Sequence, residues 1–377
     1  MKKNKSNINN ALAMLILAAA GGCCGFLFTD YASSSGGLGH KLAILPLFFL
    51  LLYAELYLQV VLHEAGHLLF GLISGYRFVS FRVGSFMLTR QNGAFRLKRL
   101  SLAGTSGQCL MAPPELANGK MPVALYNMGG VIVNAVTSVL LLPAAAGGSE
   151  SWFSIAAAMF STIGIAFALI NGIPLKFMEV DNDGRNALSL SKDPQAMRGF
   201  WIQLAVNAEL AEGKRLRELP EEWFAVPDGD SLKNSMAAAI AVFSCNRLMD
   251  EARLNEAKER MEGLLEMETG MAGVHREMLR SDALYCELMG ENRYDVVEKS
   301  LDKQLKSLMK NMRKMPSIMR TQYALALLHE NDAAKAEKLR AQFDKIAASY
   351  PYEGDVQGER ELLDMALERS KKERPLS

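Results

Sequence analysis

The fold is decided by residues Leu42–Gly75, which read LAILPLFFLLLYAELYLQVVLHEAGHLLFGLISG. At about 1.5 Å per residue, a helix of this length exceeds the ~30 Å of a hydrocarbon core. The segment is almost entirely apolar, with no base and two acids, Glu55 and Glu64, beside two histidines, His63 and His67. We therefore expect a transmembrane helix that tilts, bends or protrudes. Because ionisable groups inside a span are costly and usually functional, we also expect it to carry a site.

Near its downstream end this helix carries the pattern His63-Glu64-Ala65-Gly66-His67. An α-helix advances about 100° per residue, so positions 63 and 67 share one face and both imidazoles can bind one metal ion. Glu64 projects to the side, where it can act as a general base on water without ligating the metal. Only 5 of the 377 residues are histidines, which makes this spacing hard to attribute to chance.

Charge divides the chain into two parts. Residues 1–175 hold 11 Lys or Arg and 5 Asp or Glu, whereas residues 176–377 hold 31 and 36. We therefore expect a membrane domain over residues 1–190 and a soluble cytosolic domain over residues 191–377. Bases alternate with acids in the second part, which is typical of solvated helix faces and excludes a nucleic-acid-binding surface. The cysteine spacing fits neither a zinc knuckle nor a disulfide framework; the cysteines are Cys23, Cys24, Cys109, Cys245 and Cys286.

Four apolar runs are long enough for transmembrane helices. The expected spans are residues 11–28, 42–75, 121–146 and 152–175. The first follows a basic N-terminus as a signal peptide would, but its length favours a span. The expected cytosolic segments 1–10 and 76–120 carry three and seven Lys or Arg, and the expected external loops carry only Lys41. This asymmetry predicts a multi-pass protein of the cell membrane with both termini in the cytosol.

Between the second and third spans the pattern changes to that of β-strands. Phe78–Val83 alternates, Gln91-Asn92-Gly93 supplies a turn, and Phe95–Leu100 alternates again. These features predict a β-hairpin, and its five basic residues place it at the cytosolic interface beside the metal helix. Its edge either pairs with an extended substrate or is purely structural.

The tail after residue 185 contains no segment that could span a membrane. Three stretches with helical apolar spacing recur there at offsets of 41 and 39 residues: Asp250–Leu264, Glu291–Leu305 and Glu330–Lys345. Each follows another helical candidate, so we expect stacked helix pairs that resemble a tetratricopeptide array without matching its consensus. A simple helical bundle is the alternative. Such a domain would recruit a cytosolic protein partner or part of the substrate.

A catalytic zinc usually has three protein ligands and a water, so the two histidines leave one ligand to find. The other histidines lie in an expected external loop or in the tail. The acids after the fourth span return to the same side as the motif, and they are Glu179, Asp181 and Asp183.

Taken together, these motifs resemble the site-2 protease family of intramembrane zinc metalloproteases over roughly residues 42–190. Besides His63–His67, the resemblance rests on a Gly-rich span with an asparagine, on Asn171-Gly172-Ile173-Pro174 and on Asp183-Gly184. It implies Asp183 as the third zinc ligand. The family has a shorter stretch between the proline and the aspartate than the eight residues found here, so Glu179 stands at the common spacing. We expect Asp183, because Gly184 lets the chain turn sharply beside the metal.

The resemblance implies a zinc metalloendopeptidase whose substrates are membrane-embedded proteins or hydrophobic peptides. Glu64 would be the general base, and Zn²⁺ would be held by His63, His67 and Asp183. Asn134 and Asn171 would bind the substrate or the oxyanion, although helix packing also explains Asn134. Two other functions stay open: a non-proteolytic adaptor that recruits partners through the tail, and a metal transporter. Transport would spread ionisable groups over several spans, whereas here they lie at one depth.

Overall fold

The computed structural model describes residues 2–34, 37–91, 93–100, 105–145, 151–177 and 180–373. The chain divides into two compact units. Unit 1 comprises Met1–Gly84 and Thr105–Asp193, and unit 2 comprises Ser85–Gly104 and Pro194–Ser377. Unit 2 therefore includes a short segment that lies between the second and third apolar helices in the sequence.

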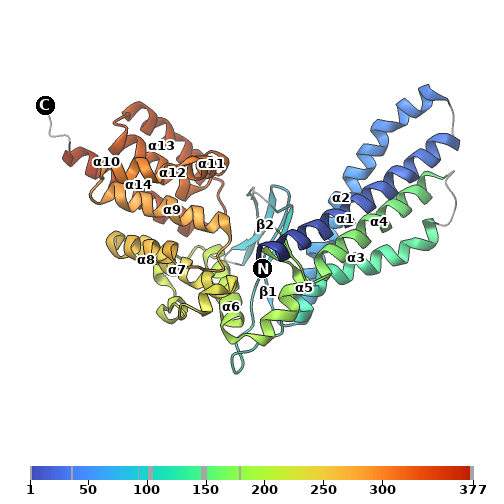
Figure 1. The fold of residues 1–377 in the computed structure, drawn as a ribbon, viewed down its shortest axis with the longest axis horizontal. Coiled ribbons are helices and arrows are strands. Elements are labelled where there is room, and N and C mark those ends of the chain that lie inside the picture. Colours follow the sequence, from blue (N-terminus) through green and yellow to red (C-terminus); the bar gives the residue numbers. More distant parts are fainter. Residues whose placement is uncertain are drawn as a thin grey trace. The chain divides into compact units, whose positions relative to one another are not determined.

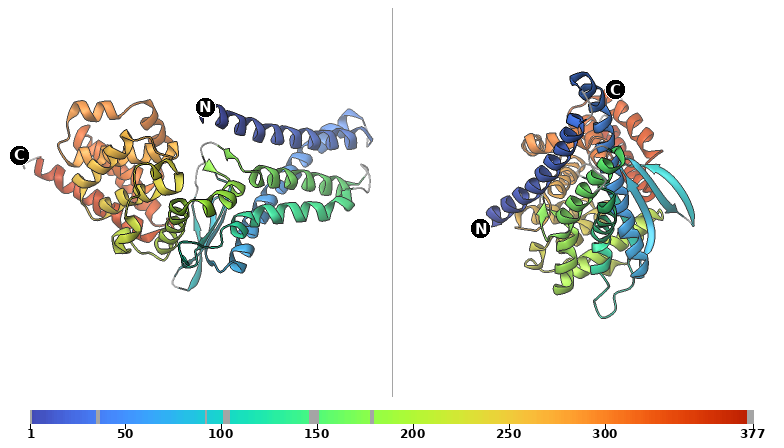
Figure 2. Two further views of the ribbon diagram at one scale, coloured as in Figure 1. Left: turned by 60° about the horizontal axis from the view of Figure 1, so that its bottom comes forward. Right: turned by 90° about the vertical axis from the view of Figure 1, so that its right-hand side faces the viewer.

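Unit 1 is built on four long apolar helices that lie side by side in Figures 1 and 2. They are α1 (Lys2–Ser34), α2 (Leu38–Ile73), α3 (Ala124–Ala145) and α4 (Trp152–Gly172). Each is long and apolar enough to cross a membrane, and the apolar part of α1 is Ile8–Ser33. Large apolar side chains such as Phe49 and Leu140 are 57% and 72% exposed, the reverse of a helix bundle made for water. The four expected apolar helices are confirmed, with ends shifted by a few residues.

Glycines bring α2, α3 and α4 close together around buried polar side chains. A Cβ at Gly66 on α2 would collide with the backbone carbonyl of Gly129 on α3. On α4, a Cβ at Gly164 would lie 2.5 Å from the side-chain nitrogen of Gln59. Small residues at these crossings let the helix backbones approach, so that side chains of α2 can bond with groups of both neighbours.

The strands are paired differently from the sequence prediction. In unit 1, β1 (Arg77–Val83) pairs antiparallel with β4 (Gly107–Ala112). In unit 2, β2 (Phe86–Gln91) and β3 (Ala94–Arg99) form a hairpin in which Gln91 faces Ala94. The prediction that residues 78–83 and 95–100 pair with each other was therefore wrong, although both segments are strands. Their true partners were missed because β4 does not alternate and because β2 buries the polar side chains of Thr89 and Gln91.

The remainder of unit 2 is helical. Its α-helices are α6 (Pro194–Ala211), α7 (Ser235–Asp250), α8 (Leu254–Glu266), α9 (Gly273–Met289), α10 (Tyr294–Ser300), α11 (Lys303–Asn311), α12 (Pro316–Ala324), α13 (Ala333–Ala347) and α14 (Glu353–Glu373). The three recurring stretches contain most of α8, α10 and α13. Before each of these helices one residue has a positive φ, namely Ala252, Asn292 and Asn331.

The hairpin β2–β3 is part of the core of unit 2. Met87 is fully buried and Leu100 nearly so, in one cluster with tail residues such as Leu248 and Leu363. The side-chain nitrogen of Gln91 donates to the backbone carbonyls of Ala211 and Pro351, both at 3.0 Å. The tail therefore folds around a segment that lies about a hundred residues upstream of it in the sequence.

Met87→Ala should consequently destabilise unit 2 by about 2–5 kcal/mol, the usual cost of a cavity left by a buried large side chain. Denaturant unfolding of the full chain, followed by emission of Trp201 and Trp223 in a Trp152→Phe background, would measure it. Leu97→Ala is the matched control, because Leu97 lies in the same hairpin but is 69% exposed. Equal midpoints for the two variants would show that the hairpin does not contribute to this core.

Candidate metal centre

Four polar side chains form a buried stripe along α2. Glu55, Gln59, His63 and His67 follow one another at four-residue spacing and are at most 9% exposed. Residues four apart lie on one helix face, so the stripe faces the neighbouring helices. At its His63–His67 end, the stripe meets the first residue of α5 (Asp183–Ser189).

The ring nitrogens of the two histidines converge with a carboxylate oxygen of Asp183. Nε2 of His63 lies 3.1 Å from Nε2 of His67, and these atoms lie 3.0 and 3.4 Å from Oδ2 of Asp183. Ligand atoms of a tetrahedral zinc site lie about 3.3 Å apart, given metal–ligand bonds of about 2.0–2.1 Å. The three atoms therefore occupy positions suited to three corners of a zinc coordination shell. Among the described residues, this is the one group of His, Cys, Asp and Glu side chains that could hold a metal.

The hydrogen bonds of each histidine fix the position of its proton. Nδ1 of His67 lies 2.9 Å from the carbonyl oxygen of Tyr126, which can only accept, so this nitrogen carries the proton. Nδ1 of His63 lies 2.7 Å from Oδ1 of Asn134. The side-chain nitrogen of Asn134 donates to the backbone oxygen and Oε1 of Gln59, at 3.0 and 2.6 Å, which fixes the orientation of its amide. Oδ1 of Asn134 therefore accepts the proton of His63.

Both histidines thus direct the lone pair of Nε2 at Asp183, whose Oδ2 is buried and has no hydrogen-bond donor. Three electron-pair donors at this separation repel one another unless a cation lies between them. Two neutral imidazoles and one carboxylate suit Zn²⁺, so the residues present fit the metal that the motif implies.

Asn182 positions Asp183, and sequence reasoning missed it. Its Oδ1 accepts from the backbone amides of Leu175 and Arg185, at 3.0 and 3.1 Å. Its side-chain nitrogen donates to the carbonyls of Ile170 and Ile173, at 2.7 and 2.6 Å. One side chain therefore caps α5 and ties it to the end of α4. An asparagine directly before an aspartate and a glycine is the N-cap signal that could have revealed this.

Gly184 has a different role from the sharp turn expected of it. It lies inside α5, and its φ is not in the left-handed region. A Cβ at this position would collide with the backbone carbonyl of Gly172. The glycine therefore allows α5 to pack against the end of α4, which brings Asp183 to the histidines.

Within the described residues, none of the other candidates belongs to the converging group. Asp181 forms an ion pair with Arg185 at 2.7 Å, and Glu179 lies outside the described residues. The side-chain nitrogen of Asn171 donates to the carbonyl of Phe167 in its own helix, at 3.0 Å. The Asn134 amide bonds to His63 and Gln59, so in this structure it supports a histidine of the group.

Glu64 is 9% exposed and faces β4. A Cβ at Gly107 would lie 2.5 Å from Oε1 of Glu64, and the backbone amide of Cys109 is directed at the same carboxylate. The Cys109 carbonyl accepts from the Tyr126 hydroxyl at 3.2 Å. Burial raises the pKa of the Cys109 thiol, with the charge of Glu64 adding to it, so this cysteine stays protonated beside the site. β4 thus holds Glu64 next to the group formed by His63, His67 and Asp183.

Replacing Asn134 tests whether this residue orients His63 or only fills space between the helices. Asn134→Leu removes the acceptor that orients His63, and loss of such an outer partner typically weakens metal binding about 10–100-fold. Asn134→Asp keeps an acceptor for the His63 proton and should retain most of the affinity. Zinc competition with a chromophoric chelator would measure both variants. If the two variants lost zinc affinity equally, the cause would be a general packing defect and not loss of the acceptor that orients His63.

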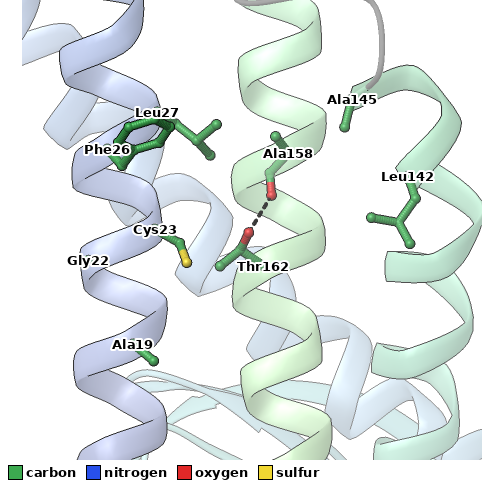
Figure 3. A pocket seen from close by; sticks show the side chains of 9 residues that line it. All are labelled: Ala19, Gly22, Cys23, Phe26, Leu27, Leu142, Ala145, Ala158 and Thr162. Atoms are coloured by element: carbon green, nitrogen blue, oxygen red, sulfur yellow. Dashed lines mark hydrogen bonds between the residues drawn. The ribbon is translucent and has the colours of Figure 1, made fainter.

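An apolar groove between α1, α3 and α4 lies elsewhere in unit 1 (Figure 3). Its volume is about 550 Å³, and its lining includes Cys23 and Phe26 of α1, Leu142 of α3 and Thr162 of α4. The hydroxyl of Thr162 donates to the carbonyl of Ala158 in its own helix at 2.8 Å. The residues that line the groove include no histidine and no carboxylate, in contrast to the group of His63, His67 and Asp183.

A scan against models of protein families, a search of curated proteins and a search of solved structures each found no match to this chain.

Proposed function

We propose that the protein is an intramembrane zinc metalloprotease of the site-2 protease type. The observation that carries this proposal is the convergence of His63, His67 and Asp183 within 3.4 Å, with Glu64 buried beside them. The arrangement is built inside helices long and apolar enough to span a membrane. A structural metal site would need no acid of this kind next to it.

The side chains have separate tasks in hydrolysis. Zinc bound by the cluster would act as a Lewis acid that polarises the scissile carbonyl and makes water more acidic. Glu64 would take a proton from the attacking water and return it to the leaving amine. Asn134 and the Tyr126 carbonyl hold the two rings, and Asn182 caps α5, whose first residue is Asp183.

The substrate class follows from the surroundings of the site. A peptide inside a bilayer is normally helical with its carbonyls internally bonded, so cleavage requires local unwinding. We therefore propose membrane-anchored proteins or hydrophobic peptides with helix-weakening residues near the cut. The excess of Lys and Arg in segments 1–10 and 76–120 supports a multi-pass protein of the cell membrane with both termini in the cytosol.

The helical part of unit 2 is proposed to be a tetratricopeptide-like repeat that binds a cytosolic partner or the cytosolic part of the substrate. The turns with positive φ at Ala252, Asn292 and Asn331 support this. Five residues further along in each case, Ala257, Val297 and Ala336 are at most 2% exposed. The same turn followed by the same buried contact is what a stacked helix-pair repeat produces.

Metal transport has one observation in its favour. Oε2 of Glu55 is buried without a hydrogen-bond partner, two turns of α2 from His63. Between them, however, Gln59 donates to the Phe160 carbonyl at 2.9 Å and accepts from Asn134. These bonds hold the Gln59 amide between α3 and α4, so it stands as a structural link between Glu55 and His63 and hydrolysis explains the site better.

The experiment that tests the proposal uses the full chain in lipid nanodiscs. Metal analysis should find one zinc per chain, and a synthetic transmembrane peptide with a central Gly or Pro should be cleaved. Chelator should stop cleavage, and added zinc should restore it. Bound zinc without cleavage of any such peptide would favour the adaptor, and zinc passing across vesicles would favour the transporter.

A further inference from the structure

The hairpin β2–β3 has two unlike faces. One face carries Met87, Thr89 and Gln91, which are at most 4% exposed within unit 2. On the same face, Lys98 forms an ion pair with Glu353 at 3.7 Å. This face attaches the hairpin to the helical tail.

The opposite face is apolar and exposed. It presents Phe86, Leu88, Phe95 and Leu97, which are 49%, 40%, 64% and 69% exposed. The strand register places Leu88 opposite Leu97, so the four side chains form one continuous surface. Contiguous apolar side chains of this size are unfavourable in water and indicate that something covers them.

Two arginines lie on the same face, and their positive charge indicates what covers it. Arg90 lies opposite Phe95, and Arg99 lies opposite Phe86, with its guanidinium 5.1 Å from the ring centroid. The face carries no acid. Aromatic and aliphatic side chains between arginines suit a lipid–water interface, where the rings enter the headgroup region and the cations meet anionic phosphates. With two arginines and no acid among its six residues, the face is positively charged, which complements anionic headgroups.

A bilayer is within reach of the hairpin. Phe86 follows Ile73, the last residue of α2, by 13 residues, a length that spans at most about 45 Å. The hairpin also belongs to the interhelical segment 76–120, which carries seven Lys or Arg.

We propose that this face, defined by Phe86, Leu88, Arg90, Phe95, Leu97 and Arg99, binds the anionic surface of the bilayer and holds the helical tail against the membrane. The inference rests on membrane insertion of the four apolar helices and is independent of the chemistry at the metal. The tail then meets its partners at the membrane surface, where membrane-anchored substrates emerge.

Depth-dependent quenching tests this contact in the full chain. A single cysteine labelled with a fluorophore is placed at Leu97 in a Cys23→Ser background, because the other four cysteines are buried. The protein is reconstituted into nanodiscs of phosphatidylglycerol and phosphatidylcholine that contain spin-labelled lipid. A label at Leu140 in α3 reports insertion of the helices. A label at Glu291, whose side chain is 72% exposed in unit 2, reports solvent.

We expect quenching at Leu97 to be several-fold greater than at Glu291 and to approach that at Leu140. It should weaken in pure phosphatidylcholine, in high salt and in Arg90→Glu/Arg99→Glu, because screening and charge reversal remove the attraction to anionic lipid. Quenching at Leu140 without quenching at Leu97 would overturn the inference and indicate a protein or substrate as the occupant of this face. No quenching at either position would instead refute membrane insertion itself.

Discussion

Glu64→Gln should lower peptide cleavage by roughly 10²–10⁴-fold, the usual contribution of a general base, while leaving bound zinc unchanged. Glutamine keeps the shape that packs against Gly107 but cannot take a proton from water. Glu64 is outside the converging group of His63, His67 and Asp183, so the metal should stay in place. Single-turnover cleavage in nanodiscs and metal analysis of the same samples would give both numbers.

His63→Ala is the matched comparison, because it should lose zinc and cleavage together. If Glu64→Gln also lost its zinc, the glutamate would have to be reassigned as a ligand. If it retained normal cleavage, the catalytic role proposed for this site would be wrong.

Asp183→Ala should weaken zinc binding by more than about 100-fold, beyond the loss expected for an outer partner, because it removes a ligand itself. Two histidines at one face of α2 would remain, without the carboxylate that offsets the charge of the metal. Chelator competition at fixed pH would measure the affinity, and cleavage should be lost in parallel.

Asp181→Ala is the control for this variant. It removes a neighbouring acid that is paired with Arg185, so zinc affinity should change little. Glu179→Ala should behave similarly. A result in which Glu179→Ala loses the metal and Asp183→Ala keeps it would show that Glu179 is the third ligand.

Local pattern was informative wherever one helix or one run of residues carries the signal. The apolar runs predicted all four long helices of unit 1 because a span needs length and composition alone. The histidine spacing predicted a shared face on α2 for the same reason, since the helix itself sets that geometry. Strand pairing failed because register depends on which partner lies alongside, and β4 carries no alternation of its own.

The sequence by itself determined the apolar helices, the two histidines on one face with Glu64 beside them, and the division into an apolar half and a charged half. Only the tertiary structure brought Asp183 to the histidines, because its position depends on Asn182 and Gly184 packing α5 against the end of α4. It also placed Asn134 within hydrogen-bond distance of His63, a contact that spacing alone does not predict. Finally, it joined residues 85–104 to the tail, because burial of Met87 depends on contacts between distant segments, which composition and spacing do not encode.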